Sequence, residues 1–192
     1  MLWDAAAQKQ VRSMGGHADR VGALSWNAHL LSSGSRDSTI VHHDVRVQQH
    51  QVGILAGHEQ EVCQLTWSPD GSSLASGGND NRICIWDSPL QNSFGARASD
   101  QARFTLTGHQ AAVKALAWCP HERNLLASGG GTADRCIKFW NTTTGAELNS
   151  IDTGSQVCSL LWSPNDKEIL SSHGFSKNEL NLWSYPGMVK IK

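Results

Sequence analysis

The sequence predicts an all-β fold, a β-propeller with about four complete blades. Three observations support this prediction. The chain has eight Trp but only one Tyr and four Phe, and the tryptophans recur at intervals of about 40–50 residues, the period of propeller repeats. Short runs of alternating apolar and polar residues, bounded by Gly, Pro, Asn and Asp, indicate antiparallel strands. Each repeat contains four such runs, which is the composition of one propeller blade.

The tryptophans fall into two sets. The first set ends an apolar alternation and comprises Trp26, Trp67, Trp118 and Trp162. The second set closes each repeat and comprises Trp3, Trp86, Trp140 and Trp183, with His43 in the position where a further Trp would fall. The longest interval of the second set coincides with the polar stretch Ser88–Gln101, which we predict to be a loop insertion.

Each repeat ends in a Gly-His pair or its equivalent, the pattern of WD repeats. We therefore expect residues 1–192 to form a single partial propeller domain. Residues 1–16 end one blade, and the complete blades span about 17–57, 58–107, 108–153 and 154–192. A closed four-bladed ring is the alternative. It is disfavoured because the chain starts within a blade and no repeat resembles a cap.

A set of polar residues recurs with the repeats and predicts a buried hydrogen-bond network. Asp would accept from the imidazole of the Gly-His pair, which would reach a strand hydroxyl and then the Trp indole. The members are His17, Ser33 and Asp37; His58, Ser76, Asp80 and Trp86; and His109, Ser128, Asp134 and Trp140. Ser-His-Asp sets also occur in hydrolases, but three copies at a fixed period favour a scaffold. The last repeat has Ser155 and Lys177 in the His and Asp positions, so we expect that blade to be less firmly tied.

Composition and motifs argue against several functions. A formal net charge of −1 gives no reason to expect nucleic acid as a partner, and no apolar run is long enough to span a membrane. The five cysteines include no C-x-x-C pair, so we expect no disulfide. His42, His43, Asp44 and His50 could suggest a metal site, but neighbouring residues of a strand point to opposite faces. We predict no metal, no cofactor and no enzymatic activity.

The Gly-rich turns and Gly-His loops lie at the same end of the strands, so they share one face of the propeller. Four uncharged hydrogen-bonding side chains fall in these loops: Asn79, Asn81, Thr132 and Gln156. They are candidates for a binding site, although Asn and Thr also favour turns for reasons of backbone geometry.

Several strings between the repeats resemble the Fizzy family, the co-activators of the anaphase-promoting complex. These are SSGSRD (Ser32–Asp37), HHDVR (His42–Arg46), GGNDN (Gly77–Asn81), ASGGGTADR (Ala127–Arg135) and DTGSQVCS (Asp152–Ser159). The resemblance runs from Leu2 to Tyr185. HHDVRV and AWCP lean toward the mitotic Fizzy branch, whereas TADRC and DTGSQVC are also similar to the Fizzy-related branch.

The resemblance implies a seven-bladed propeller that binds degrons, the KEN box and the destruction box, of cell-cycle proteins and presents them to the ubiquitin ligase. The KEN-box positions of the family match Asn79, Asn81, Thr132 and Gln156. Implied partners are subunits of the anaphase-promoting complex, degron-bearing substrates and spindle-checkpoint proteins, in nucleus and cytoplasm. The destruction-box pocket of the family would be incomplete in a chain of four blades. The alternative function is a WD-repeat interaction scaffold without degron specificity.

Overall fold

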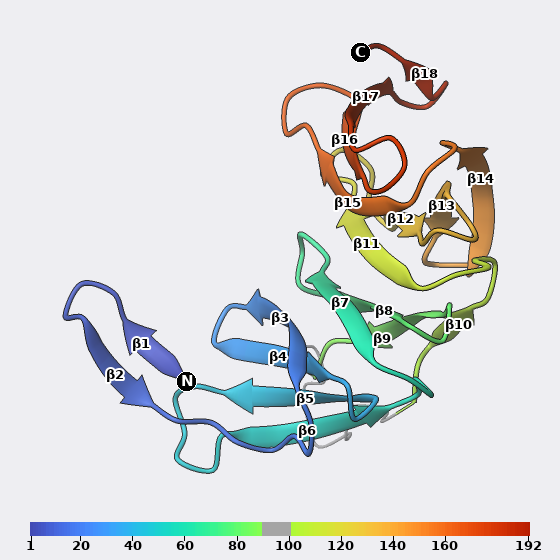
Figure 1. Cartoon of the computed structure of the whole chain (residues 1–192). Coiled ribbons are helices and arrows are strands. Elements are labelled where there is room, and N and C mark those ends of the chain that lie inside the picture. The colour runs from blue at the N-terminus through green and yellow to red at the C-terminus, as the bar shows by residue number, and fades with distance from the viewer. Residues whose placement is uncertain (90–100) are drawn as a thin grey trace.

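A computed structural model describes residues 1–89 and 101–192, in which four four-stranded antiparallel sheets follow one another along an open arc (Figure 1). The described residues contain no α-helix, and the all-β prediction is confirmed. None of them forms a helix with the length and apolar character needed to cross a membrane. Most of the predicted insertion, Ser88–Gln101, lies outside the described residues.

The strands follow the order of the chain within each sheet. A two-stranded hairpin comes first, with β1 (Leu2–Asp4) and β2 (Lys9–Arg12). The first sheet contains β3 (Val21–Asn27), β4 (Leu30–Ser35), β5 (Thr39–Asp44) and β6 (Gln51–Ala56). The second contains β7 (Val62–Trp67), β8 (Ser73–Gly78), β9 (Ile83–Asp87) and β10 (Phe104–Leu106).

The other two sheets repeat this order. The third contains β11 (Val113–Trp118), β12 (Leu125–Gly130), β13 (Cys136–Asn141) and β14 (Ala146–Asp152). The fourth contains β15 (Val157–Trp162), β16 (Glu168–His173), β17 (Leu180–Ser184) and β18 (Val189–Lys190). We call the four sheets blades 1 to 4.

The blades stack through a buried apolar layer and an unusually close contact. A Gly at the same position of the second strand of blades 1 to 3 faces the first Val of the next blade. A Cβ added at Gly34, Gly77 or Gly129 would lie 2.6 Å from Val62, 2.7 Å from Val113 or 2.4 Å from Val157, respectively. No larger side chain fits there without displacing the neighbouring blade, so glycine sets the spacing between blades.

The first set of tryptophans also joins neighbouring blades. The indole Nε1 of Trp67 donates to Ser32 Oγ at 3.1 Å, that of Trp118 to the Thr66 carbonyl at 3.0 Å, and that of Trp162 to the Ala117 carbonyl at 3.1 Å. Each ring is buried against the preceding blade. Trp26, the corresponding residue of blade 1, is instead 50% exposed.

The first strand of every blade contains a register shift at the same place. The shifts lie between Val21 and Ala23, Val62 and Gln64, Val113 and Ala115, and Val157 and Ser159. The residues in between, which have no Cα partner on the second strand, are Gly22, Cys63, Lys114 and Cys158. A bulge of this kind redirects a side chain, and three of these residues line the hollow described next.

Candidate functional site

The Asn79 side chain is held by two neighbours on blade 2. Its Oδ1 accepts from the thiol of Cys63, with a sulfur–oxygen distance of 3.1 Å, and its Nδ2 donates to Glu61 Oε2 at 3.4 Å. Glu61 is itself paired with Arg20 of blade 1 at 2.5 Å. The amide of Asn79 therefore has a fixed orientation, with its nitrogen on the side of the Arg20–Glu61 ion pair.

Asn79 lines an open hollow of about 410 Å³ on the loop face of blades 1 to 3. The hollow is formed by Arg20, Gly22, Glu61, Cys63, Asn79 and Lys114. Sequence reasoning found only Asn79 among these residues. A positional signal was present for Glu61, because it precedes the first Val of its blade just as Gln156 precedes Val157. The bulges that bring Cys63 and Lys114 to the hollow have no such signal.

Thr132 and Gln156 lie together at the junction of blades 3 and 4. The Thr132 hydroxyl donates to Gln156 Oε1 at 3.0 Å. Thr132 is exposed and Gln156 half-buried. With its oxygen engaged by Thr132, the Gln156 amide presents its Nε2 donor to a ligand.

Asn81 has a backbone role. Its φ is +65°, and the residue at the same turn position of the other blades is also left-handed: Ser38 at +67°, Arg135 at +60° and Asn178 at +49°. Asn tolerates this conformation better than most residues. The structure thus brings Thr132 and Gln156 into contact and places Asn79 in the hollow. Neither the hollow nor the Thr132–Gln156 pair includes Asn81.

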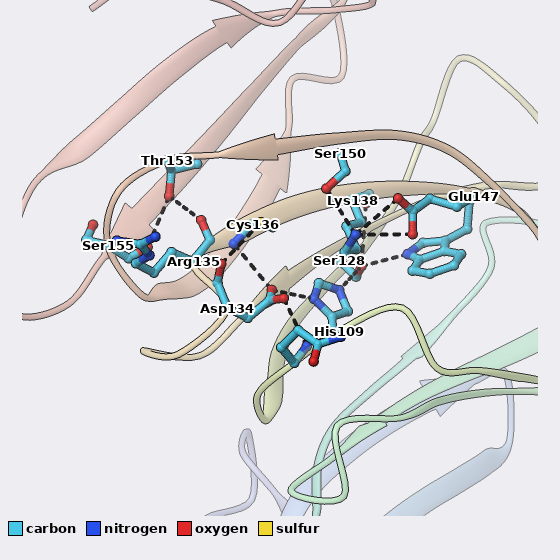
Figure 2. Close-up of polar contacts among 12 residues, drawn as sticks. His109, Ser128, Asp134, Arg135, Cys136, Lys138, Glu147, Ser150, Thr153 and Ser155 are labelled. Atoms are coloured by element: carbon cyan, nitrogen blue, oxygen red, sulfur yellow. Dashed lines mark hydrogen bonds and ion pairs between the residues drawn. The ribbon is translucent and has the colours of Figure 1, made fainter.

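The hydrogen-bond network is present in the first three blades. In blade 3, His109 Nδ1 lies 2.7 Å from Asp134 and Nε2 lies 2.6 Å from the Ser128 hydroxyl (Figure 2). Trp140 Nε1 donates to the same hydroxyl at 2.7 Å. Burial raises the pKa of Asp134, but hydrogen bonds from His109 and from the backbone of Gln110 and Cys136 outweigh it, so the pKa falls below its usual value. The Asp134 carboxylate therefore stays charged and holds the loop that contains His109 and Gln110.

Blades 1 and 2 contain equivalent contacts. In blade 2, His58 lies 3.0 Å from Asp80 and 2.8 Å from Ser76, to which Trp86 donates at 2.9 Å. In blade 1, His17 lies 3.0 Å from Asp37 and 2.8 Å from Ser33. His43 takes the place of the Trp, with its Nε2 3.0 Å from Ser33. All three Ser-His-Asp sets tie strands together and are buried or half-buried, as expected of a scaffold.

In the last blade a different histidine takes part in the network, and its ring contacts hydroxyl groups rather than an Asp, so that this blade is less firmly tied stays a prediction. His173 enters the network from the end of strand β16, whereas the network histidines of blades 1 to 3 lie in the loops before the first strand of their blades. Its Nε2 lies 2.7 Å from Ser171 and its Nδ1 3.0 Å from Ser155, and Trp183 donates to Ser171 at 2.8 Å. In this blade a strand residue supplies the imidazole in place of the Gly-His loop, and the Ser–Trp contact is kept.

The histidines of blade 1 separate as the strand pattern predicts. His42 Nδ1 contacts Ser32 at 2.8 Å, whereas His43 points to the other face and meets His50, with 2.9 Å between the two Nδ1 atoms. Burial, followed by repulsion from neighbouring histidines, lowers the pKa of both His42 and His43 to about 4. Both rings are therefore neutral at physiological pH.

These features define a WD-repeat β-propeller whose loop face presents oriented amide and hydroxyl groups. The family model for the CDC20/Fizzy WD40 domain matches residues 1–192. Protein FIZZY-RELATED 3 of Arabidopsis thaliana is 56% identical over 190 residues, which cover 99% of this chain and 38% of that protein. The anaphase-promoting complex subunit cdc20 of Dictyostelium discoideum is 58% identical over 189 residues, with 98% and 37% covered.

A solved structure agrees. A chain in the crystal structure of the mitotic checkpoint complex superposes with a TM-score of 0.91 at 55% identity, covering 98% of this chain and 56% of that one. The chain belongs to the CDC20/Fizzy family. It spans less than two fifths of the length of the two curated relatives, and relatives of the Fizzy-related and cdc20 types match it about equally well.

Proposed function

We propose that the protein is a non-enzymatic substrate receptor of the anaphase-promoting complex, which binds degrons on the loop face of its propeller. The observation that carries the proposal is the orientation of the site. Asn79 is fixed by Glu61 and Cys63, and Gln156 by Thr132. Oriented neutral groups of this kind suit a peptide whose own side chains are polar.

The KEN box is the degron that fits this site. Its Asn offers both a donor and an acceptor, which an amide such as Asn79 can match. Its Glu can accept from the Gln156 Nε2 that Thr132 leaves available. Neutral partners allow such contacts without burying an unpaired charge.

The family relationship supports the wider proposal. The Dictyostelium discoideum relative is described as a subunit of the anaphase-promoting complex, and a further relative, Cell division cycle 20.1 of Arabidopsis thaliana, as a cofactor of APC complex. The structural match comes from the mitotic checkpoint complex. We propose the corresponding partners for this protein: the ligase, degron-bearing substrates and spindle-checkpoint proteins. We further propose a location in nucleus and cytoplasm and a complete ring of seven blades.

The proposal is tested with fluorescently labelled peptides. A peptide containing Lys-Glu-Asn should bind more tightly than the same peptide with these three residues replaced by Ala, measured by fluorescence anisotropy. Equal binding of both peptides would favour a general WD-repeat scaffold without degron specificity.

A further inference from the structure

Lys114 is the cation of the hollow that no carboxylate neutralises. It lies at the bulge of β11 and is exposed. The part of the chain that the structure describes contains no ion pair with it, whereas Arg20 is paired with Glu61 at 2.5 Å. Two cations and one carboxylate line the hollow, which therefore carries one net positive charge.

Asn79 adds a hydrogen-bond donor beside this charge. One N–H of its Nδ2 is directed to Glu61. The second has no partner among residues 1–89 and 101–192, and the Glu61 carboxylate, which can only accept, keeps the amide nitrogen on its side. A carboxylate entering the hollow can therefore form an ion pair with Lys114 beside the Asn79 amide, whose free N–H stays available to the core of the degron.

The hollow extends the site away from the Thr132–Gln156 pair. It lies on blades 1 to 3 and reaches Arg20 and Gly22, whereas Thr132 and Gln156 are at the junction of blades 3 and 4. A peptide in contact with both regions would place a residue outside its core motif in the hollow.

We infer that the hollow binds an acidic side chain that flanks the degron core, with Lys114 as its cation. The inference rests on the proposed function, because it assumes that a peptide lies across the loop face. It adds a preference: among peptides with the same core, those with Asp or Glu on one side of the core bind more tightly. An exposed ion pair contributes modestly, so we expect about a two- to fivefold gain in affinity.

The test uses three peptides with amidated C-termini, so that side chains supply their only carboxylates. All contain Lys-Glu-Asn. One has acidic residues before the core, one after it, and one has Gln in both places. Affinities are measured for the protein and for Lys114→Gln, Lys114→Glu and the control Lys9→Gln, which changes an exposed lysine of β2.

One acidic peptide should bind the unmodified protein and Lys9→Gln more tightly than the Gln peptide does. Lys114→Gln should remove this advantage, so that the acidic peptide and the Gln peptide bind this variant equally, and Lys114→Glu should reverse the preference. The inference would be overturned if neither acidic peptide bound the unmodified protein more tightly than the Gln peptide, or if the tighter binding persisted in Lys114→Gln. Either result would leave KEN recognition intact. If the Gln peptide and its triple-Ala version bind equally, the proposed function fails first.

Discussion

At the scale of single residues, a buried hydroxyl serves as the junction of each network. Ser128 is fully buried and accepts from Trp140 while contacting His109. Its single oxygen is the partner of two ring nitrogens, His109 Nε2 and Trp140 Nε1. Buried polar groups are stabilising only when all are paired. Removing the Ser128 hydroxyl should therefore lower the stability of the protein by more than the loss of a single atom would suggest.

Replacing Ser128 by Ala should therefore strongly destabilise blade 3. The change leaves His109 Nε2 and Trp140 Nε1 without their partner, for which we expect a loss of about 2–4 kcal/mol in the free energy of unfolding. Chemical denaturation measures this loss. The control Ser159→Ala, an exposed residue of β15, should change stability by less than about 0.5 kcal/mol. Similar midpoints for the two variants would contradict this role.

The neutral histidines of blade 1 predict a pH dependence of stability. His42 and His43 have a pKa of about 4 in the folded protein, against about 6.5 in an unfolded chain. The unfolded chain binds protons that the folded chain does not, so this contribution is complete above pH 6.5, falls as the pH falls, and levels off near pH 4.

The variant His43→Gln tests this pH dependence. Gln keeps a donor for Ser33 but does not titrate, so the loss of stability between pH 6.5 and pH 4 should shrink. His121→Gln, at an exposed residue, serves as the control and should retain the full dependence. The same slope in unfolding free energy against pH for both variants would refute the explanation.

The repeating residues of the networks were predictable from sequence because their spacing recurs, but substitutions within them were not. Nothing in the spacing shows that His173 replaces the missing Gly-His imidazole, because it lies at the end of strand β16 and not in the Gly-His loop. Asn79, Thr132 and Gln156 were singled out by their place in the loops of one face, and the resemblance assigned them to the KEN-box site. The orientation of the Asn79 side chain depends on Glu61 and Cys63, and that of Gln156 on Thr132, and these contacts arise only in the folded chain.

At the scale of elements, the strand and blade pattern was readable and the bulges were not. Alternation of apolar residues identifies a strand, yet it reads continuously through Val113–Ala115, where the register shifts. The shift depends on pairing with the neighbouring strand. Lys114 therefore looked like an ordinary outward residue of a strand, although the bulge brings it into the hollow.

The contact between blades predicts the effect of a single methyl group. Gly129→Ala would place a Cβ 2.4 Å from Val157, and the overpacking should destabilise the protein by about 1–3 kcal/mol. Gly15→Ala is the matched control, because nothing lies within 4 Å of its added Cβ. Thermal unfolding compares the two variants, and an unchanged midpoint for Gly129→Ala would show that the blades can move apart freely.

At the scale of the whole molecule, the arc leaves apolar side chains exposed at both ends. Leu24 and Trp26 on blade 1 are 61% and 50% exposed, and Leu161 and Leu180 on blade 4 are 66% and 64% exposed. Apolar faces and strand edges of this kind favour association. The number of repeats predicts these exposed surfaces, because each blade face in a complete propeller is covered by the neighbouring blade and an incomplete ring leaves faces uncovered.

We therefore expect the 192-residue chain to self-associate at micromolar concentration, as measured by analytical ultracentrifugation. The double variant Trp26→Lys and Leu161→Lys should shift the distribution toward monomer, because it places a charge on each exposed face. A compact monomer of the unmodified chain at that concentration would contradict the expectation.

The central claim, that oriented amides on the loop face bind a degron, is tested most directly by titrating a Lys-Glu-Asn peptide against Asn79→Ala and Gln156→Ala. Each variant removes neutral hydrogen bonds worth about 0.5–1.5 kcal/mol, so each should bind roughly two- to tenfold more weakly. Asn165→Ala, on the turn at the opposite end of the strands, should bind like the unmodified protein. Unchanged affinity in both Asn79→Ala and Gln156→Ala would contradict the site, though not the fold.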